Sequence, residues 1–177
     1  MEKLNQYQRL ILTNQNRILA LLDPSHEGVY SKRASIAARG LEGLYDILFR
    51  DVSPDDEITP YEICEETSKI LDMYLVIQNN IDVFSAEEKK ELRLERLDFE
   101  GFDANHDKHY YYMKFMVQEM GMYNEWINKV WNSHTQNSLF KYRQMLSAYV
   151  EYLKNHAYQL DKDGILSILY AVYPKKG

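Results

Sequence analysis

Apolar side chains recur every three or four residues along most of this chain, and that spacing limits the folds open to it. The first segment shows the pattern clearly, because one helical face collects Leu4, Tyr7, Ile11, Ile18 and Leu22. No stretch alternates apolar and polar residues with a period of two for long, as a half-buried strand would require. The spacing therefore predicts an all-α protein.

Further apolar faces follow at residues 30–48, 63–81, 112–120 and 139–153. Two of the expected helices are preceded by the spacing of a capping box, in which a hydroxyl accepts the N3 amide and a glutamate reaches back to the cap. The first box is Thr59 with Glu62, and it places Pro60 at the first helical position. The second box is Ser85 with Glu88, before a short and highly charged helix.

Two other helix starts depend on a single capping residue. Ser25 is placed to cap the helix expected over 30–48. Asp161 is placed to cap the last helix, with Leu160 and Ile165 spaced as a hydrophobic staple around it. In total, about seven helical segments joined by short polar connections predict a single-domain multi-helix bundle over residues 1–177.

Composition excludes several classes of protein. The chain has one cysteine, Cys64, so no intramolecular disulfide can form and a reducing compartment is expected. Polar residues interrupt every apolar stretch near the N-terminus, so neither a signal peptide nor a membrane span is expected there. These features predict a cytoplasmic protein that does not enter a membrane.

Charge and aromatic content bear on the partners of the protein. The formal net charge is -6, and the basic residues are scattered instead of clustered, which argues against nucleic-acid binding. The one stretch that favours a nucleic-acid-binding helix contains Lys32, Arg33 and Arg39. Tyrosine is abundant, with 15 copies, and suits subunit interfaces because its ring packs while its hydroxyl stays hydrated. We therefore expect a homo-oligomer that also binds a protein partner.

The stretch 99–115, FEGFDANHDKHYYYMKF, concentrates polar side chains that could form a site. Asp103, Asn105 and Asp107 have the spacing of the first calcium ligands in an EF-hand, but Lys108 and Lys114 replace its required glycine and glutamate. Calcium binding is therefore not favoured.

A transition-metal site would use His106 and His109, which are three residues apart, with His134 as a third ligand if the fold brings it close. The structural alternative is that Asp103 or Asn105 caps a helix start. The cofactor is unknown, and the sequence as a whole indicates none.

A second polar cluster is Asn132-Ser133-His134. Serine beside histidine in sequence does not form a catalytic pair, since nucleophile and base must meet in space and the base needs an orienting carboxylate. Capping of a helix or bracing of a loop is the simpler role for Ser133. The catalytic residues remain unknown, and the candidate polar site comprises six residues from the two clusters: Asp103, Asn105, His106, His109, Asn132 and His134.

Several segments resemble one family over nearly the whole chain. They are QRLILTNQ (8–15), LDP (22–24), ILDMY (70–74), GFDAN (101–105), NSH (132–134) and KYRQML (141–146). In order and spacing these segments are similar to the YfbU family of bacterial proteins. The resemblance implies an all-helical cytoplasmic protein that self-assembles, and it assigns no catalytic residues. The charged segment 85–98 departs from the family pattern, because it is longer than the connection usual there.

Two classes of function follow from these features. The first, which we favour, is a non-enzymatic helical protein that acts through self-association and protein binding. The second is an enzyme or a small-ligand or metal-binding protein that uses the candidate polar site. The second class requires that segments 103–109 and 132–134 converge in one concave pocket.

Overall fold

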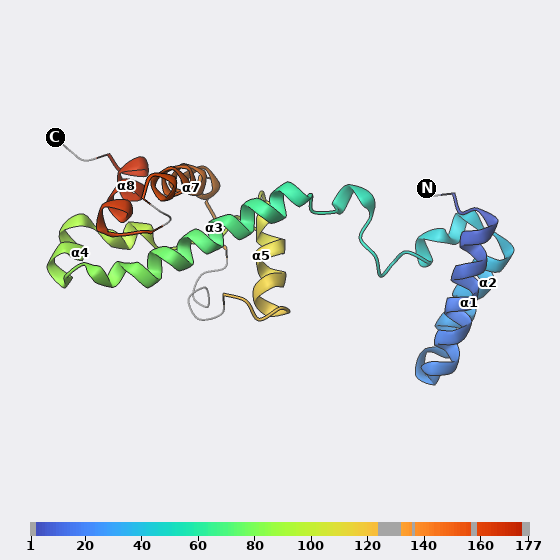
Figure 1. Ribbon diagram of the computed structural model, residues 1–177. Coiled ribbons are helices and arrows are strands. Elements are labelled where there is room, and N and C mark those ends of the chain that lie inside the picture. Colours follow the sequence, from blue (N-terminus) through green and yellow to red (C-terminus); the bar gives the residue numbers. More distant parts are fainter. Residues whose placement is uncertain (1–2, 124–131, 136, 157–158, 175–177) are drawn as a thin grey trace. The chain divides into compact units, whose positions relative to one another are not determined.

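A computed structural model of the chain describes residues 3–123, 132–135, 137–156 and 159–174 (Figure 1). Within these residues it contains seven α-helices, several short 3-10 helices and no strand, so the predicted all-α fold is confirmed. The chain divides into two compact units, Met1–Ile58 and Thr59–Gly177. The single domain expected over 1–177 stays a prediction.

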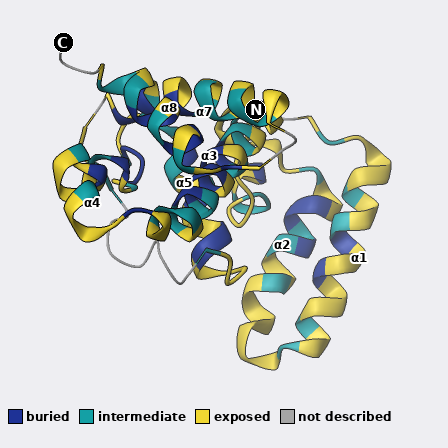
Figure 2. Ribbon diagram, turned by 60° about the vertical axis from the view of Figure 1, so that its left-hand side comes forward, coloured by how far each residue is buried: buried dark blue, intermediate teal, exposed yellow. Residues whose placement is uncertain are grey.

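The first unit is a helical hairpin. Helix α1 spans Gln6–Leu22 and lies beside α2, Glu27–Arg39 (Figures 1 and 2). A capping box that the sequence reasoning missed starts α1, in which Asn5 accepts the amide of Gln8 and the Gln8 side chain accepts the amide of Asn5. The hairpin is followed by 3-10 helices at Glu42–Ile47 and Asp55–Glu57.

Two expectations for this unit are wrong. The helix expected over 30–48 ends at Arg39, because Gly40 takes the left-handed conformation with φ of 65°. Ser25 does not cap α2, since it lies inside a 3-10 turn and its hydroxyl bonds to Asp23 and to the ring of His26. A helix end at a left-handed glycine is typical, because glycine has no Cβ to clash with the backbone.

The second unit contains the remaining described α-helices. These are α3 (Tyr61–Asn80), α4 (Ala86–Leu92), α5 (Lys108–Gln118), α7 (Ser138–Asn155) and α8 (Lys162–Val172). The capping box of Ser85 with Glu88 and the Asp161 cap are both confirmed. The Thr59 capping box is wrong, because Pro60 occupies the cap position in extended conformation and α3 begins one residue later than expected.

Helix α3 runs through the core of this unit. Five of its side chains, Ile70, Leu71, Met73, Tyr74 and Ile77, are fully buried. They belong to one cluster with buried side chains of α5, α7 and α8 and of the segment 84–102 (Figure 2). None of the helices in the part of the chain described here is long and apolar enough to cross a bilayer.

Candidate functional site

The two predicted polar segments meet in the structure. Phe102 and Asn132 form a parallel β-bridge, and the amide of Ser133 donates to the carbonyl of Phe102 at 3.1 Å. The side-chain oxygen of Asn132 accepts from two amides, Ala104 at 3.2 Å and His134 at 3.1 Å. Asn132 therefore ties the 102–104 loop to the segment that precedes α7.

Asp103 organises the loop that leads into α5. Its carboxylate accepts the amide of Asn105 at 2.9 Å and lies 3.0 Å from Nδ1 of His106. The hydrogen bond from Asn105 and then the contact with His106 lower the pKa of Asp103 below its ordinary value. Neither Asp103 nor Asn105 caps α5, since the helix begins at Lys108 with Asp107 at its cap position and no side-chain cap bond. Asp103 instead holds the preceding turn.

His109 points toward a different partner from His106. The His109 ring is buried, lies 5.3 Å from the ring of Phe102 in a stacked orientation, and places Nε2 2.9 Å from a carboxylate oxygen of Glu66. Its Nδ1 atom is buried and has no hydrogen-bond partner among the residues that the structure describes. His106 and His109 therefore contact different carboxylates and do not converge on one metal position. Among the described residues, no group of three or more histidine, cysteine, aspartate or glutamate side chains could hold a metal ion.

Glu66 lies at the centre of this network, and the sequence reasoning missed it. Arg143 binds it through two hydrogen bonds, from Nε at 2.7 Å and from Nη2 at 2.8 Å. These bonds, followed by the one to His109, lower the pKa of Glu66 from 4.5 to about 2. An ionised carboxylate only accepts, so Nε2 of His109 carries the proton that it donates. The partners are 43 and 77 residues from Glu66 in sequence, so no local motif could identify them.

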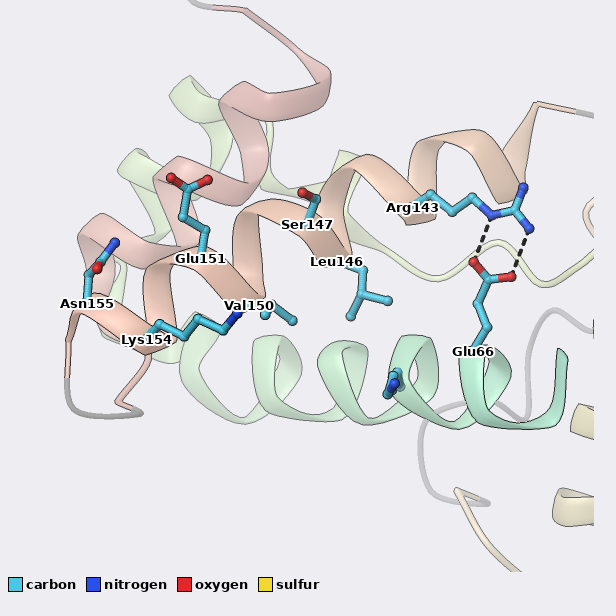
Figure 3. A pocket seen from close by; sticks show the side chains of 9 residues that line it. Glu66, Arg143, Leu146, Ser147, Val150, Glu151, Lys154 and Asn155 are labelled. Carbon is cyan, nitrogen blue, oxygen red and sulfur yellow. Dashed lines mark hydrogen bonds and ion pairs between the residues drawn. The ribbon is translucent and has the colours of Figure 1, made fainter. Parts of the chain in front are cut away.

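Glu66 and Arg143 lie at one end of a surface groove between α3 and α7 (Figure 3). The groove has a volume of about 770 Å³. Leu146 and Val150 form its apolar part, and charged side chains of both signs surround them, including Glu151. None of the six residues of the predicted polar site lines this groove.

A second candidate surface lies on α1, where the usual order of burial is reversed. The buried residues of α1 are Thr13 and Asn16, whose side chains donate to helix carbonyls four residues earlier, at 2.7 and 2.8 Å. Seven large apolar residues of the same helix are exposed: Tyr7, Leu10, Ile11, Ile18, Leu19, Leu21 and Leu22. Most of them lie on the side opposite Thr13 and Asn16 at 100° per residue. The exposed side of α1 is therefore its apolar face, and we define this face by Tyr7, Ile11, Ile18, Leu21 and Leu22.

Charge is also scarce on this helix. Arg9 and Arg17 are the charged residues of α1, and no acidic residue lies between Gln6 and Leu22. Across the whole chain, 27% of residues are charged. Depletion of charge together with exposed aliphatic and aromatic side chains is typical of the core of a protein interface.

A family model supports the resemblance seen in the sequence. The YfbU domain matches residues 1–171 of the 177-residue chain. The matched range includes α1, the polar segments around Asp103 and Asn132, and the network of Glu66. The chain belongs to the YfbU family.

Proposed function

We propose that this chain is a helical assembly protein of the cytoplasm, which self-associates through the apolar face of α1 and binds other proteins in its assembled form. One observation carries the proposal: α1 buries polar side chains against its own unit and exposes its apolar ones. Tyr7 is 72% exposed, Ile18 55% and Leu22 75%. A helix with this distribution gains stability only when another surface covers it.

The size of the first unit supports this proposal. A compact unit of 58 residues buries a smaller fraction of its surface than a larger domain does, and oligomerisation is one way in which units of this size gain stability. If each of the five side chains of the apolar face of α1 loses roughly 90 Å² on pairing, two helices bury about 900 Å² together, which is below the standard size of specific interfaces and fits a weak, concentration-dependent association. A second copy of the chain carries an identical face that can cover this one.

The test is the mass of the full chain in solution, measured by light scattering. We expect the unaltered chain to be an oligomer and the Ile11→Glu/Ile18→Glu variant to be a monomer of 21.1 kDa with its helix content retained. Val52→Glu is the matched control, because Val52 is an exposed apolar residue of the same unit outside α1, at 68% exposure. An unaltered chain that stays monomeric at high concentration contradicts the proposal.

The second candidate function is small-ligand or metal binding at the polar site. The observation that favours it is the meeting of Phe102 and Ala104 with Asn132. Elemental mass spectrometry of the untagged chain tests it directly. Stoichiometric metal that is lost in a His106→Ala/His109→Ala variant supports metal binding at this site. A chain that contains no metal contradicts metal binding.

A further inference from the structure

The apolar face of α1 is arranged almost symmetrically about the middle of the helix. Its two halves are apolar, and the centre is polar, with exposed Asn14 and Gln15. Tyr7 lies as far before this centre as Leu22 lies after it, and Ile11 lies as far before it as Ile18 lies after it. Leu10 and Leu19 are also equidistant from this centre, but they lie on opposite flanks of α1, outside the apolar face.

We propose that two copies of α1 pair in antiparallel orientation, across a two-fold axis between Asn14 and Gln15. This inference rests on the proposed function and specifies its partner, which is a second copy of the same helix. A two-fold interface must be self-complementary, so that residue i of one copy meets residue j of the other and the reverse also holds. The symmetric spacing of α1 meets this condition, with Tyr7 against Leu22 of the second copy and Ile11 against Ile18.

The helix dipoles favour the antiparallel orientation over the parallel one. In an antiparallel pair the dipoles of the two helices oppose each other, whereas in a parallel pair like ends lie together. The charged side chains do not decide between the orientations, because Arg9 lies against Gly40 on the buried side of α1 and Arg17 lies outside the apolar face.

The polar centre fixes the register of the pair. Asn14 and Gln15 carry amide groups that both donate and accept, so they can hydrogen-bond across the axis. A shift of the register by one helical turn would place these amides against isoleucine or leucine and leave them unpaired. A single polar residue in an apolar helix interface is known to select register in this way.

Engineered cysteines in the full chain test this geometry, in a Cys64→Ser background that removes the native thiol. Asn14→Cys lies next to the proposed axis, so we expect oxidised glutathione to convert it to a disulfide-linked dimer, with two thiols oxidised and the glutathione disulfide reduced. Tyr7→Cys should stay unlinked, because the two copies of this position lie roughly 22 Å apart along an antiparallel pair. A mixture of Tyr7→Cys and Leu22→Cys chains should link one to the other.

The outcomes separate this inference from the proposed function. Self-linking of Tyr7→Cys in a dimeric chain indicates parallel helices and overturns the antiparallel pairing alone. A dimer in which none of these cysteines links overturns the pairing through α1 and places the contact elsewhere. If light scattering shows that the Cys64→Ser chain and the unaltered chain are both monomers, both the pairing and the proposed self-association are overturned.

Discussion

Replacement of Glu66 by glutamine should destabilise the second unit, by an amount that depends on pH. Glu66 accepts two hydrogen bonds from Arg143 and one from His109. Glutamine keeps the shape of the side chain, but it removes the charge and presents an NH2 group to one of these donors. The buried ring of His109 then loses a charged acceptor. Both partners should therefore be held less tightly in the Glu66→Gln variant.

The magnitude follows from the pKa of Glu66. Lowering the pKa from 4.5 to about 2 corresponds to roughly 3 kcal/mol for a fully shielded group. The Glu66 side chain retains 25% exposure and Arg143 retains 54%, so solvent screening weakens the pair. We expect the variant to lose about 1 to 2 kcal/mol of unfolding free energy at pH 6.

The sign of the pH dependence is determined by the same shift. The pKa of Glu66 is lower in the folded chain than in the unfolded chain, so between pH 4.5 and about 2 the unfolded state binds more protons. The stabilisation is complete above pH 4.5 and is lost as the pH falls toward 2. The difference between the unaltered chain and Glu66→Gln should therefore shrink by more than half between pH 6 and pH 3.

Urea unfolding followed by far-UV circular dichroism measures this difference, because most of the described α-helical residues belong to the second unit. Glu65→Gln is the matched control, since Glu65 pairs with Lys69 at 2.9 Å on the exposed surface and should contribute little. Equal effects of Glu66→Gln at pH 6 and pH 3, or an effect no larger than that of Glu65→Gln, would refute the reasoning.

Two further substitutions test the packing of the individual units. Tyr142→Phe removes a fully buried hydroxyl that accepts the amide of Glu100 at 3.1 Å and donates to the carbonyl of Gly101 at 2.8 Å. Two backbone groups then lose their partner, so urea unfolding should show a loss of about 1 to 3 kcal/mol, and a loss below the error of the measurement would contradict this assignment. Gly40→Ala forces alanine into the left-handed conformation and places its Cβ against the guanidinium of Arg9. The unfolding free energy of the hairpin should therefore fall by about 1 to 2 kcal/mol, which far-UV circular dichroism should show as melting at a lower temperature. Gly28→Ala, where a Cβ meets nothing within 4 Å, is the control and should not cause this loss.

Local signals predicted part of the fold well. Helical spacing identified the all-α class, and the caps at Ser85 and Asp161 form as expected, because each involves residues within one turn. The Thr59 box had the same sequence signature, yet Pro60 takes the cap position in its place. The same motif fits a helix that starts at Pro60 and one that starts at Tyr61. Packing of the helix against the rest of the unit selects between the two starts, and a local motif holds no information about that packing.

The candidate site was predicted less completely. Asn132 contacts the 102–104 loop, so the two polar segments are close as the second class of function requires, whereas His109 turns to Glu66, which Arg143 also binds. Long-range partners of this kind depend on how α3, α5 and α7 pack.

The first helix shows a second limit of the sequence pattern. The spacing of Tyr7, Ile11 and Ile18 correctly predicted a helix with one apolar face. That spacing is the same whether the face meets the core of its own unit or the surface of another molecule. The structure adds the decisive information, because it shows Thr13 and Asn16 buried on the opposite side of α1.

The measurement that tests the central claim most directly is sedimentation equilibrium of the unaltered, untagged chain over a wide concentration range. Self-association through α1 predicts a mass that is a multiple of 21.1 kDa and that falls toward this value on dilution. A mass of 21.1 kDa at every concentration would contradict the account, because the apolar face of α1 would then stay uncovered by a second copy.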